Sequence, residues 1–244
     1  MRLSKAWLIA SKDFMIFWKK PTILYSLVFF ELLMSLGFPF LVKYIVSRTS
    51  NLAVIGARID AFSFWFAIGA AILPVGIASY SLVGEKLQQS LEPLLAAPVT
   101  DGEILVGKGI AAFLPAIVSS YVSAVPFMVL VDVFVHGTFH HLYYPNWNIG
   151  VILLLLAPLV SLFSVAANVL ISSRSGDVRT AQQLGTAIPM LPLIAIYLLT
   201  EARVITLTLS TLLVIGAVLA VLDVLTISAA IGSFRRDVIL TEWT

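Results

Sequence analysis

The chain of 244 residues has no cysteine and few charged residues. Without thiols it cannot form disulfide bonds, use a thiol nucleophile or bind a metal through thiolates. Charged residues make up only 11% of the chain, whereas soluble domains contain about a quarter. The formal net charge of +2 is too small to indicate a nucleic-acid partner. These shortages argue against a soluble domain and favour a protein of the lipid bilayer.

The hydrophobic residues, 60% of the chain, form runs long enough to cross a bilayer, which takes about 20 helical residues. Six spans are predicted, at residues 22–46, 61–83, 104–131, 149–172, 181–199 and 205–233. The predicted fold is therefore a single all-α integral membrane domain over residues 1–244, with six transmembrane helices. Prolines recur inside the later spans and predict kinks there, at Pro74, Pro115, Pro126, Pro158, Pro189 and Pro192.

The distribution of lysine and arginine predicts which side of the membrane each loop occupies. Because six is an even number, both ends of the chain are expected on the same side. Eleven basic residues fall on that side: Arg2, Lys5, Lys12, Lys19, Lys20, Lys86, Lys108, Arg174, Arg179, Arg235 and Arg236. Only four fall on the other side: Lys43, Arg48, Arg58 and Arg203. The positive-inside rule therefore predicts a multi-pass protein of the plasma or inner membrane with both termini in the cytoplasm.

Residues 1–20 are predicted to form an amphipathic helix rather than a span or a cleaved signal peptide. One face is apolar and consists of Leu3, Ala6, Trp7, Ala10, Phe14, Phe17 and Trp18. The opposite face carries Lys5, Lys12, Lys19 and Lys20. A basic helix with tryptophans is typical of the lipid headgroup plane. Two roles remain open, a general interfacial anchor or a brace for the bundle beside a cytoplasmic partner.

The segment from Glu85 to Lys108, here called the insert, separates the second and third spans and has the pattern of a docking surface. One side of its helical projection is apolar and is formed by Leu87, Leu91, Leu94 and Leu95. Polar side chains occupy much of the rest, namely Glu85, Lys86, Gln88, Gln89 and Glu92. Pro93 predicts a kink or an early end of this helix, and Pro98 predicts a turn. Thr100 and Glu103 then fit a capping box that begins the third span. The alternative is an amphipathic loop that lies on the lipid surface.

The insert resembles the cytoplasmic signature of ABC-2 type transporter permeases. That signature has a Leu-Glu-x-Leu-Leu core, a Pro-Val turn and a Gly-Lys pair after the second of six spans. The matching string here runs from Glu85 through Leu94-Leu95-Ala96-Ala97-Pro98-Val99 to Glu103-Ile104 and Gly107-Lys108. The basic tail at residues 234–244 and the N-terminal helix, the elbow helix of that family, are also similar. Pro93 departs from the family pattern, which has a helix-compatible residue there. Many members also have short re-entrant helices between spans five and six, and residues 205–233 leave room for one small piece.

The resemblance implies a role in ATP-driven export. Residues 84–100 would form a coupling helix that seats in a cleft of a separate ABC ATPase subunit. The contacting residues would be Glu85, Lys86, Leu87, Leu91, Glu92, Leu94, Leu95 and Pro98. ATP and magnesium would be bound by that subunit, so this chain would hold no cofactor and would not be an enzyme. Two permeases, either a homodimer or a pair with a sister permease, would enclose the pathway. An ion-coupled secondary transporter and a non-transporting membrane anchor for a partner protein are the alternatives.

Two further patterns invite other interpretations. Residues 102–109 nearly match a phosphate-binding loop, but Gly109 occupies the position of the hydroxyl that binds magnesium, so a nucleotide site is not expected. The three histidines, His136, His140 and His141, share an outer loop with Asp132 nearby. Three aromatic residues in or next to this loop, Tyr143, Tyr144 and Trp147, favour a belt at the membrane surface over a metal site.

Glu31 and Asp223 lie well inside predicted spans, where ionisable side chains are costly and usually face the protein interior or a wet cavity. Together with Asn168 they are candidates for a substrate or cation path. The alternative is that each makes a structural hydrogen bond to a neighbouring helix.

Overall fold

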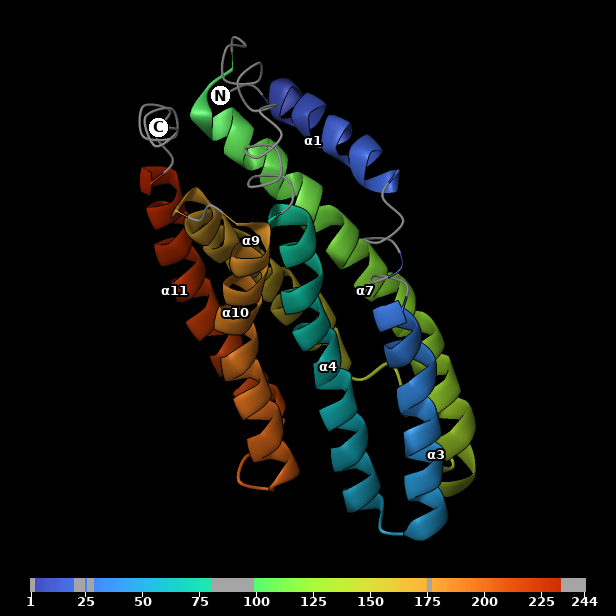
Figure 1. Ribbon diagram of the computed structural model, residues 1–244. Helices are drawn as coiled ribbons and strands as arrows, with labels where there is room; N and C mark the ends of the chain where they lie inside the picture. Colours follow the sequence, from blue (N-terminus) through green and yellow to red (C-terminus); the bar gives the residue numbers. More distant parts are fainter. Residues whose placement is uncertain (1–2, 20–24, 26–28, 80–98, 175–176, 234–244) are drawn as a thin grey trace.

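The computed structural model describes residues 3–19, 25, 29–79, 99–174 and 177–233, and these residues are almost entirely helical (Figure 1). The elements are α1 (Leu3–Trp18), η1 (Leu33–Gly37), α3 (Phe38–Arg48), α4 (Leu52–Ser79), α7 (Asp101–Phe139), α8 (Trp147–Val151), η3 (Ile152–Leu156), α9 (Ala157–Arg174), α10 (Val178–Glu201) and α11 (Leu209–Ser233). The elements η1 and η3 are single π-helical turns within longer helices. The chain is thus an all-helical bundle over the described ranges.

Within this part of the chain, six helices are long and apolar enough to cross a membrane. They are Phe29–Arg48, Leu52–Ser79, Asp101–Phe139, Trp147–Ser172, Val178–Glu201 and Leu209–Gly232. The predicted number and order of spans are confirmed, and the chain is a multi-pass membrane protein by these criteria.

Two predicted boundaries were wrong. The second helix begins at Leu52 instead of residue 61, and the third continues to Phe139 instead of residue 131. Charged side chains broke the apolar runs in the sequence, but in the structure they have partners outside their own helix. Arg58, for example, forms an ion pair with Glu201 near the end of α10. The helices therefore extend past the apolar runs from which their ends were predicted.

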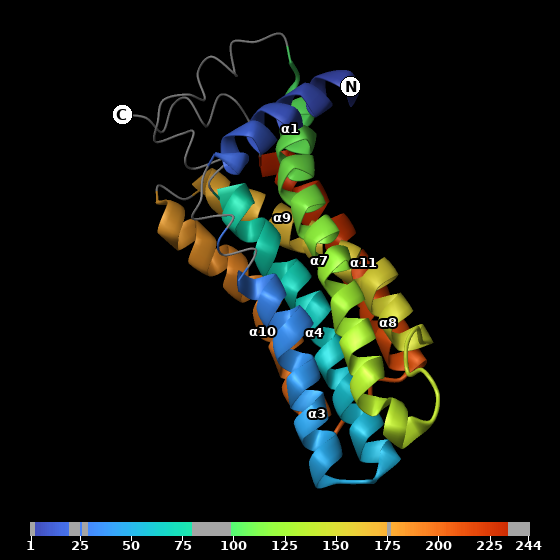
Figure 2. The same cartoon turned by 90° about the vertical axis from the view of Figure 1, so that its right-hand side faces the viewer.

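Helix α4 is the centre of the bundle and packs against α3, α7, α9 and α10 (Figures 1 and 2). Small residues such as Gly69, Ala70 and Ala71 line its middle, and small residues allow helices to approach closely in a membrane. Large side chains such as Phe64 and Phe66 fill the space between the close contacts. In contrast, α10 and α11 bury only small parts of their length and present many apolar side chains outward, as lipid-facing helices do.

The two π-helical turns explain how two spans accommodate a proline. Pro39 follows η1 by two residues, and Pro158 follows η3 by two residues. A proline ring clashes with the carbonyl group four residues earlier, and the wider π turn relieves that clash. Five other prolines lie inside continuous α-helices, namely Pro74, Pro115, Pro126, Pro189 and Pro192.

The connection from α10 to α11 is a short set of turns. Residues 202–208 are all described, none of them is helical, and α11 continues without interruption to Ser233. The small re-entrant piece for which the sequence left room is therefore not formed between these two helices.

Helix α1 lies along the first turns of α7, at the end of the bundle where α4 and α11 also end (Figure 1). Four of its apolar side chains are buried: Ala6, Ile9, Ala10 and Phe17. The amphipathic helix predicted for residues 1–20 is confirmed over Leu3–Trp18. Its buried face is narrower than predicted, because Trp7 is 52% exposed. Of the two roles left open, packing against the bundle is thus present in the structure.

Gly107 is a point of close contact between α1 and α7. A β-carbon built on Gly107 would lie 2.7 Å from the Ala6 carbonyl oxygen and 2.8 Å from the Ile9 Cβ. Gly102, one and a half turns earlier in α7, has no atom within 4 Å of such a β-carbon. We predict that Gly107→Ala lowers the free energy of unfolding by about 1–3 kcal/mol through overpacking.

The matched control Gly102→Ala should leave stability unchanged or raise it slightly, because alanine is the better helix former. Denaturant unfolding in detergent, followed by circular dichroism, measures both. Equal stability of the two variants would contradict the close packing of α1 on α7.

Candidate functional site

The residues predicted to contact an ATPase, from Glu85 to Pro98, lie outside the described residues, as does the tail at 234–244. The structure does describe the chain on both sides of that segment. Helix α4 ends at Ser79, and residues 99–108 lead into α7. The end of α4 at Ser79 is here called the α4 stem, and residues 99–108 are here called the α7 stem. They connect the insert to the bundle along the chain.

The α7 stem begins with a complete capping box. The Thr100 hydroxyl oxygen accepts a hydrogen bond from the Glu103 backbone N–H at 3.3 Å, and the Glu103 carboxylate accepts one from the Thr100 N–H at 3.0 Å. Both groups would otherwise be unpaired at a helix N-terminus. The capping box predicted from the sequence is confirmed, and it fixes where the third span begins.

A buried ion pair ties the α7 stem to α1. The Lys108 ammonium nitrogen lies 3.7 Å from an Asp13 carboxylate oxygen, and each side chain is only 2% exposed. Gly107 lies directly before Lys108 at the close contact with Ala6 and Ile9. The Gly-Lys pair of the insert thus serves as a packing and pairing point for α1. Residues 102–109 are helical, so they do not form the phosphate-binding loop that their sequence nearly matches.

A buried amide ties the α4 stem to two other helices. The Asn168 side-chain nitrogen in α9 donates to the Ser79 hydroxyl oxygen at 2.8 Å and to the Ala181 carbonyl oxygen in α10 at 3.3 Å. The Asn168 amide oxygen accepts from the Ser172 hydroxyl at 3.0 Å. Asn168 is fully buried, and its bonds to Ser79 and Ala181 are hydrogen bonds to neighbouring helices. Both stems are therefore held by buried polar contacts, one through Asp13 and the other through Asn168.

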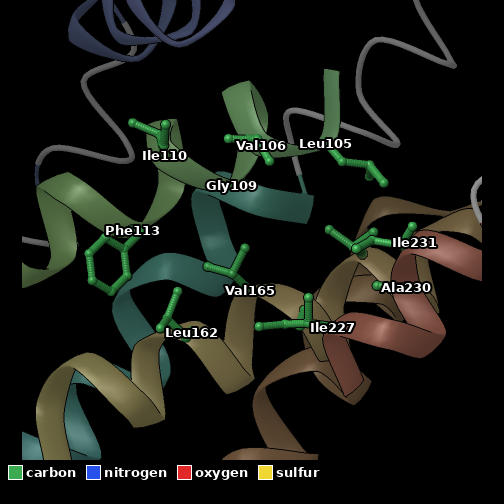
Figure 3. Close-up of a pocket in the computed structure, with 12 residues that line it drawn as sticks. Leu105, Val106, Gly109, Ile110, Phe113, Leu162, Val165, Ile227, Ala230 and Ile231 are labelled. Carbon is green, nitrogen blue, oxygen red and sulfur yellow. The ribbon is translucent and has the colours of Figure 1, made fainter. Parts of the chain in front are cut away.

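An apolar groove of about 230 Å³ lies beside the α7 stem, between α7, α9 and α11. Figure 3 shows Phe113 of α7 beside Leu162 of α9, and Leu105 of α7 near Ile231 of α11, with Val165 and Ile227 between them. Every labelled side chain in it is hydrocarbon, apart from Gly109, so the groove offers no polar side-chain group for recognition. The α7 stem is therefore in close contact with α1, whereas the groove separates part of it from α11.

Glu31 and Asp223 lie at separate places. Glu31 lines a cavity of about 310 Å³ between the first span and α7, with Ser35, Ser119 and Ser123. Asp223 is 5% exposed in α11, and neither of its carboxylate oxygens has a hydrogen-bond partner in the described part of the chain. The structure thus brings Glu31 together with serine hydroxyls but leaves Asp223 and Asn168 elsewhere.

A polar cavity at the opposite end of the bundle was missed by the sequence analysis. It has a volume of about 530 Å³, and its polar lining includes Asn51, Asp60, Asn148, Thr200, Arg203 and Thr208. The Asp60 carboxylate accepts from the Tyr143 hydroxyl at 3.0 Å and from the Asn148 side-chain nitrogen at 3.0 Å. Asp60 could have been noticed as another carboxylate within an apolar helix. Its partners Tyr143 and Asn148 lie more than eighty residues away in the sequence, so the pairing could not have been noticed there.

The outer loop that supplies Tyr143 is held by Asp132. The backbone N–H groups of Tyr143 and Tyr144 donate to one Asp132 oxygen at 2.9 and 3.0 Å. The His141 ring contacts the Phe139 carbonyl oxygen, and His140 ends α7 in a left-handed conformation. Asp132 therefore organises the aromatic loop, in which Tyr144 is buried and Trp147 is 81% exposed.

The buried ion pair can be tested by removing one partner at a time. We predict that Asp13→Asn and Lys108→Met each lower the free energy of unfolding, by up to about 3–5 kcal/mol, because each removes one of the two opposite charges of a buried ion pair. Lys19→Met, at an exposed lysine beyond the end of α1, should change it by less than about 0.5 kcal/mol.

The exchange of both residues, Asp13→Lys with Lys108→Asp, should recover part of the loss. Denaturant unfolding in detergent measures the loss in the double variant and in the single variants Asp13→Lys and Lys108→Asp. If the loss in the double variant equals the sum of the two single losses, the two charges do not interact.

The Tyr143 phenol provides a pH-dependent test of the outer cavity. Burial raises the pKa of Tyr143, and the neighbouring Asp60 charge and hydrogen bond raise it further. The folded state thus keeps the phenol protonated at a pH where an unfolded tyrosine, with a pKa of about 10, ionises. The stabilisation is complete below pH 10 and declines as the pH rises above it.

We therefore predict that wild type is more stable than Tyr143→Phe at neutral pH, and that the difference narrows between about pH 9 and pH 11. Thermal unfolding in detergent across this range measures it. A difference that stays constant up to pH 11 would mean that the phenol is not shielded in this way.

Comparisons with known proteins identified no relatives, since no protein-family model matches the chain and no curated protein matches its sequence.

Proposed function

We propose that this chain is the transmembrane permease of an ATP-driven exporter of the ABC-2 type. Two permeases would enclose the pathway, and a separate ATPase subunit would bind the insert of each. The observation that carries the proposal is the way in which the chain on either side of the insert is held in the bundle. A segment with a leucine stripe leaves and re-enters the bundle at two stems, and each stem is fixed by buried polar contacts.

The leucine stripe of the insert suits a protein cleft. Burial of each leucine side chain contributes about 1.5–3 kcal/mol before the cost of association is subtracted. Glu85, Lys86 and Glu92 flank the stripe and would set its orientation through charge pairing. ATP and magnesium would remain on the ATPase subunit, and the substrate would leave through the membrane part.

The stems provide a route by which movement of the insert reaches the spans. Coupling between distant sites requires rigid elements whose positions both sites influence. A displacement of the α4 stem is passed to α9 and α10 through Asn168. A displacement of the α7 stem is shared with α1 through Asp13 and Lys108, and the groove on the α11 side leaves room for it.

A second candidate function, ion-coupled transport without an ATPase, is favoured by one observation. Asp223 is a buried carboxyl group without a hydrogen-bond partner among the described residues, and buried carboxyl groups of this kind occur in proton relays. This function predicts transport driven by an ion gradient and lost on Asp223→Asn, with no dependence on the insert.

Purification of the chain from its native host separates the two. We predict that an ATPase is recovered in stoichiometric amount with the wild-type chain and is lost on Leu91→Asp or Leu94→Asp, because a carboxylate in the leucine stripe cannot be buried in the cleft. The control is Leu142→Asp, at a leucine that is 65% exposed in the outer loop. It should retain the ATPase.

Quantitative mass spectrometry of the purified complex and its ATP hydrolysis rate give the two readouts. A chain that is recovered alone and still transports its substrate would overturn the exporter proposal.

A further inference from the structure

The polar cavity at the end of the bundle away from α1, the outer cavity, has the size and the lining of a small-molecule site. It lies between the turn that joins α3 to α4 and the turns that join α10 to α11 (Figure 1). Its volume of about 530 Å³ falls within the range of about 300–1,000 Å³ that is typical of ligand pockets. Val54, Ala57, Ile205 and Leu207 supply apolar walls. All residues that line the cavity belong to the described ranges.

Asp60 contributes a half-buried carboxylate whose hydrogen-bond donors are both neutral. These donors are the Tyr143 hydroxyl and the Asn148 side-chain nitrogen, each at 3.0 Å. A carboxylate can accept about four hydrogen bonds in total, and a charge removed from water is costly unless it is paired. The two neutral donors therefore leave acceptor capacity on Asp60 for an ammonium group.

Arg203 lines the same cavity and has an uncommon backbone conformation. Its φ of 59° is in the left-handed region that favours glycine, and its backbone N–H donates to the Thr200 carbonyl oxygen at 3.0 Å where α10 ends. Residues other than glycine in this conformation are concentrated at functional sites. Neither Asp60 nor Arg203 belongs to an ion pair of the described residues. Arg203 is exposed and Asp60 is half-buried, so two opposite charges line one cavity at different depths.

We propose that the outer cavity binds a small zwitterion with an apolar body. Its ammonium group donates to the Asp60 carboxylate, its anionic group pairs with Arg203, and its apolar part lies against the walls. A molecule with only one of these charges leaves the other residue without a partner. Two sources carry this chemistry, a short peptide in solution and the ethanolamine headgroup of a phospholipid. The inference goes beyond the exporter proposal and does not depend on it, because binding is measured without an ATPase.

Calorimetric titration of the purified chain in a non-ionic detergent tests the soluble source with three dipeptides. Leucyl-leucine carries both charges, its N-acetyl form lacks the ammonium group, and its C-terminal amide lacks the carboxylate. Leucyl-leucine should bind most tightly. Each analogue should bind about 10- to 100-fold more weakly, which is the factor expected for the loss of one hydrogen bond to a charged group.

Lipid nanodiscs test the headgroup source. The chain should unfold at a higher temperature in discs of phosphatidylethanolamine than in discs of phosphatidylglycerol, which has no ammonium group. Asp60→Asn should remove most of this difference. A positive result in either arm supports the site and identifies its source, whereas no effect in both arms would overturn the inference.

Variants of the two charged residues assign each contact. Asp60→Asn should weaken the binding of leucyl-leucine and of the amide but not of the N-acetyl form, because only the first two have an ammonium group. Arg203→Gly should weaken leucyl-leucine and the N-acetyl form but not the amide. Because glycine suits the left-handed backbone better than arginine does, poorer folding cannot explain such a loss.

The control is Arg48→Gln, at an exposed arginine of α3 that lies over the Tyr44 ring and does not line the cavity. It should leave the binding of all three dipeptides unchanged. If Asp60→Asn weakens all three dipeptides equally, Asp60 has a structural role only, and the proposed contact with an ammonium group is wrong.

Discussion

The structure depends on one constraint, which is that polar groups within a bilayer must find their partners inside the protein. The six long helices satisfy the backbone, and the π turns before Pro39 and Pro158 relieve the clash that each proline ring would otherwise cause. The same constraint governs the side chains. Asp13 is paired with Lys108, Arg58 with Glu201, and Asn168 uses its amide in three hydrogen bonds. Among the described residues the constraint is not met everywhere, since neither carboxylate oxygen of the buried Asp223 has a hydrogen-bond partner there.

Features encoded by neighbouring residues were predictable from the sequence. Run length and periodicity predicted the six spans and the amphipathic helix of α1, and residues 100–103 predicted the capping box, because all of these depend on local spacing. Contacts between distant residues were not predictable. Asp13 and Lys108 lie in different helices, and nothing near Gly107 in the sequence indicates that α1 must approach it closely. The pairing of Asp60 with Tyr143 and Asn148 likewise joins residues far apart in the sequence.

The two stems that connect the insert to the bundle are held in different ways. The α4 stem is bound to α9 and α10, whereas the α7 stem is bound to α1 and faces an apolar groove. Movement of α4 would therefore disturb its packing against α9 and α10. Movement of α7 together with α1 would change the width of the groove and would also act on α3 and α4, against which α7 packs. In an exporter, the groove would give the α7 stem room to follow a displacement of the insert. The alternative transporter driven by ions would have no need of this asymmetry.

Helix α7 has 39 residues, which corresponds to about 58 Å and nearly twice the thickness of a hydrocarbon core. One continuous helix thus carries Lys108 near one end and Asp132 near the other, and Asp132 holds the loop whose Tyr143 binds Asp60 in the outer cavity. Because α7 is one continuous helix, a tilt of α7 as a rigid body would move its Lys108 end and its Asp132 end in opposite directions. In an exporter of the proposed kind, the groove and the cavity at the other end of the bundle would then be linked by a helix and not by a loop.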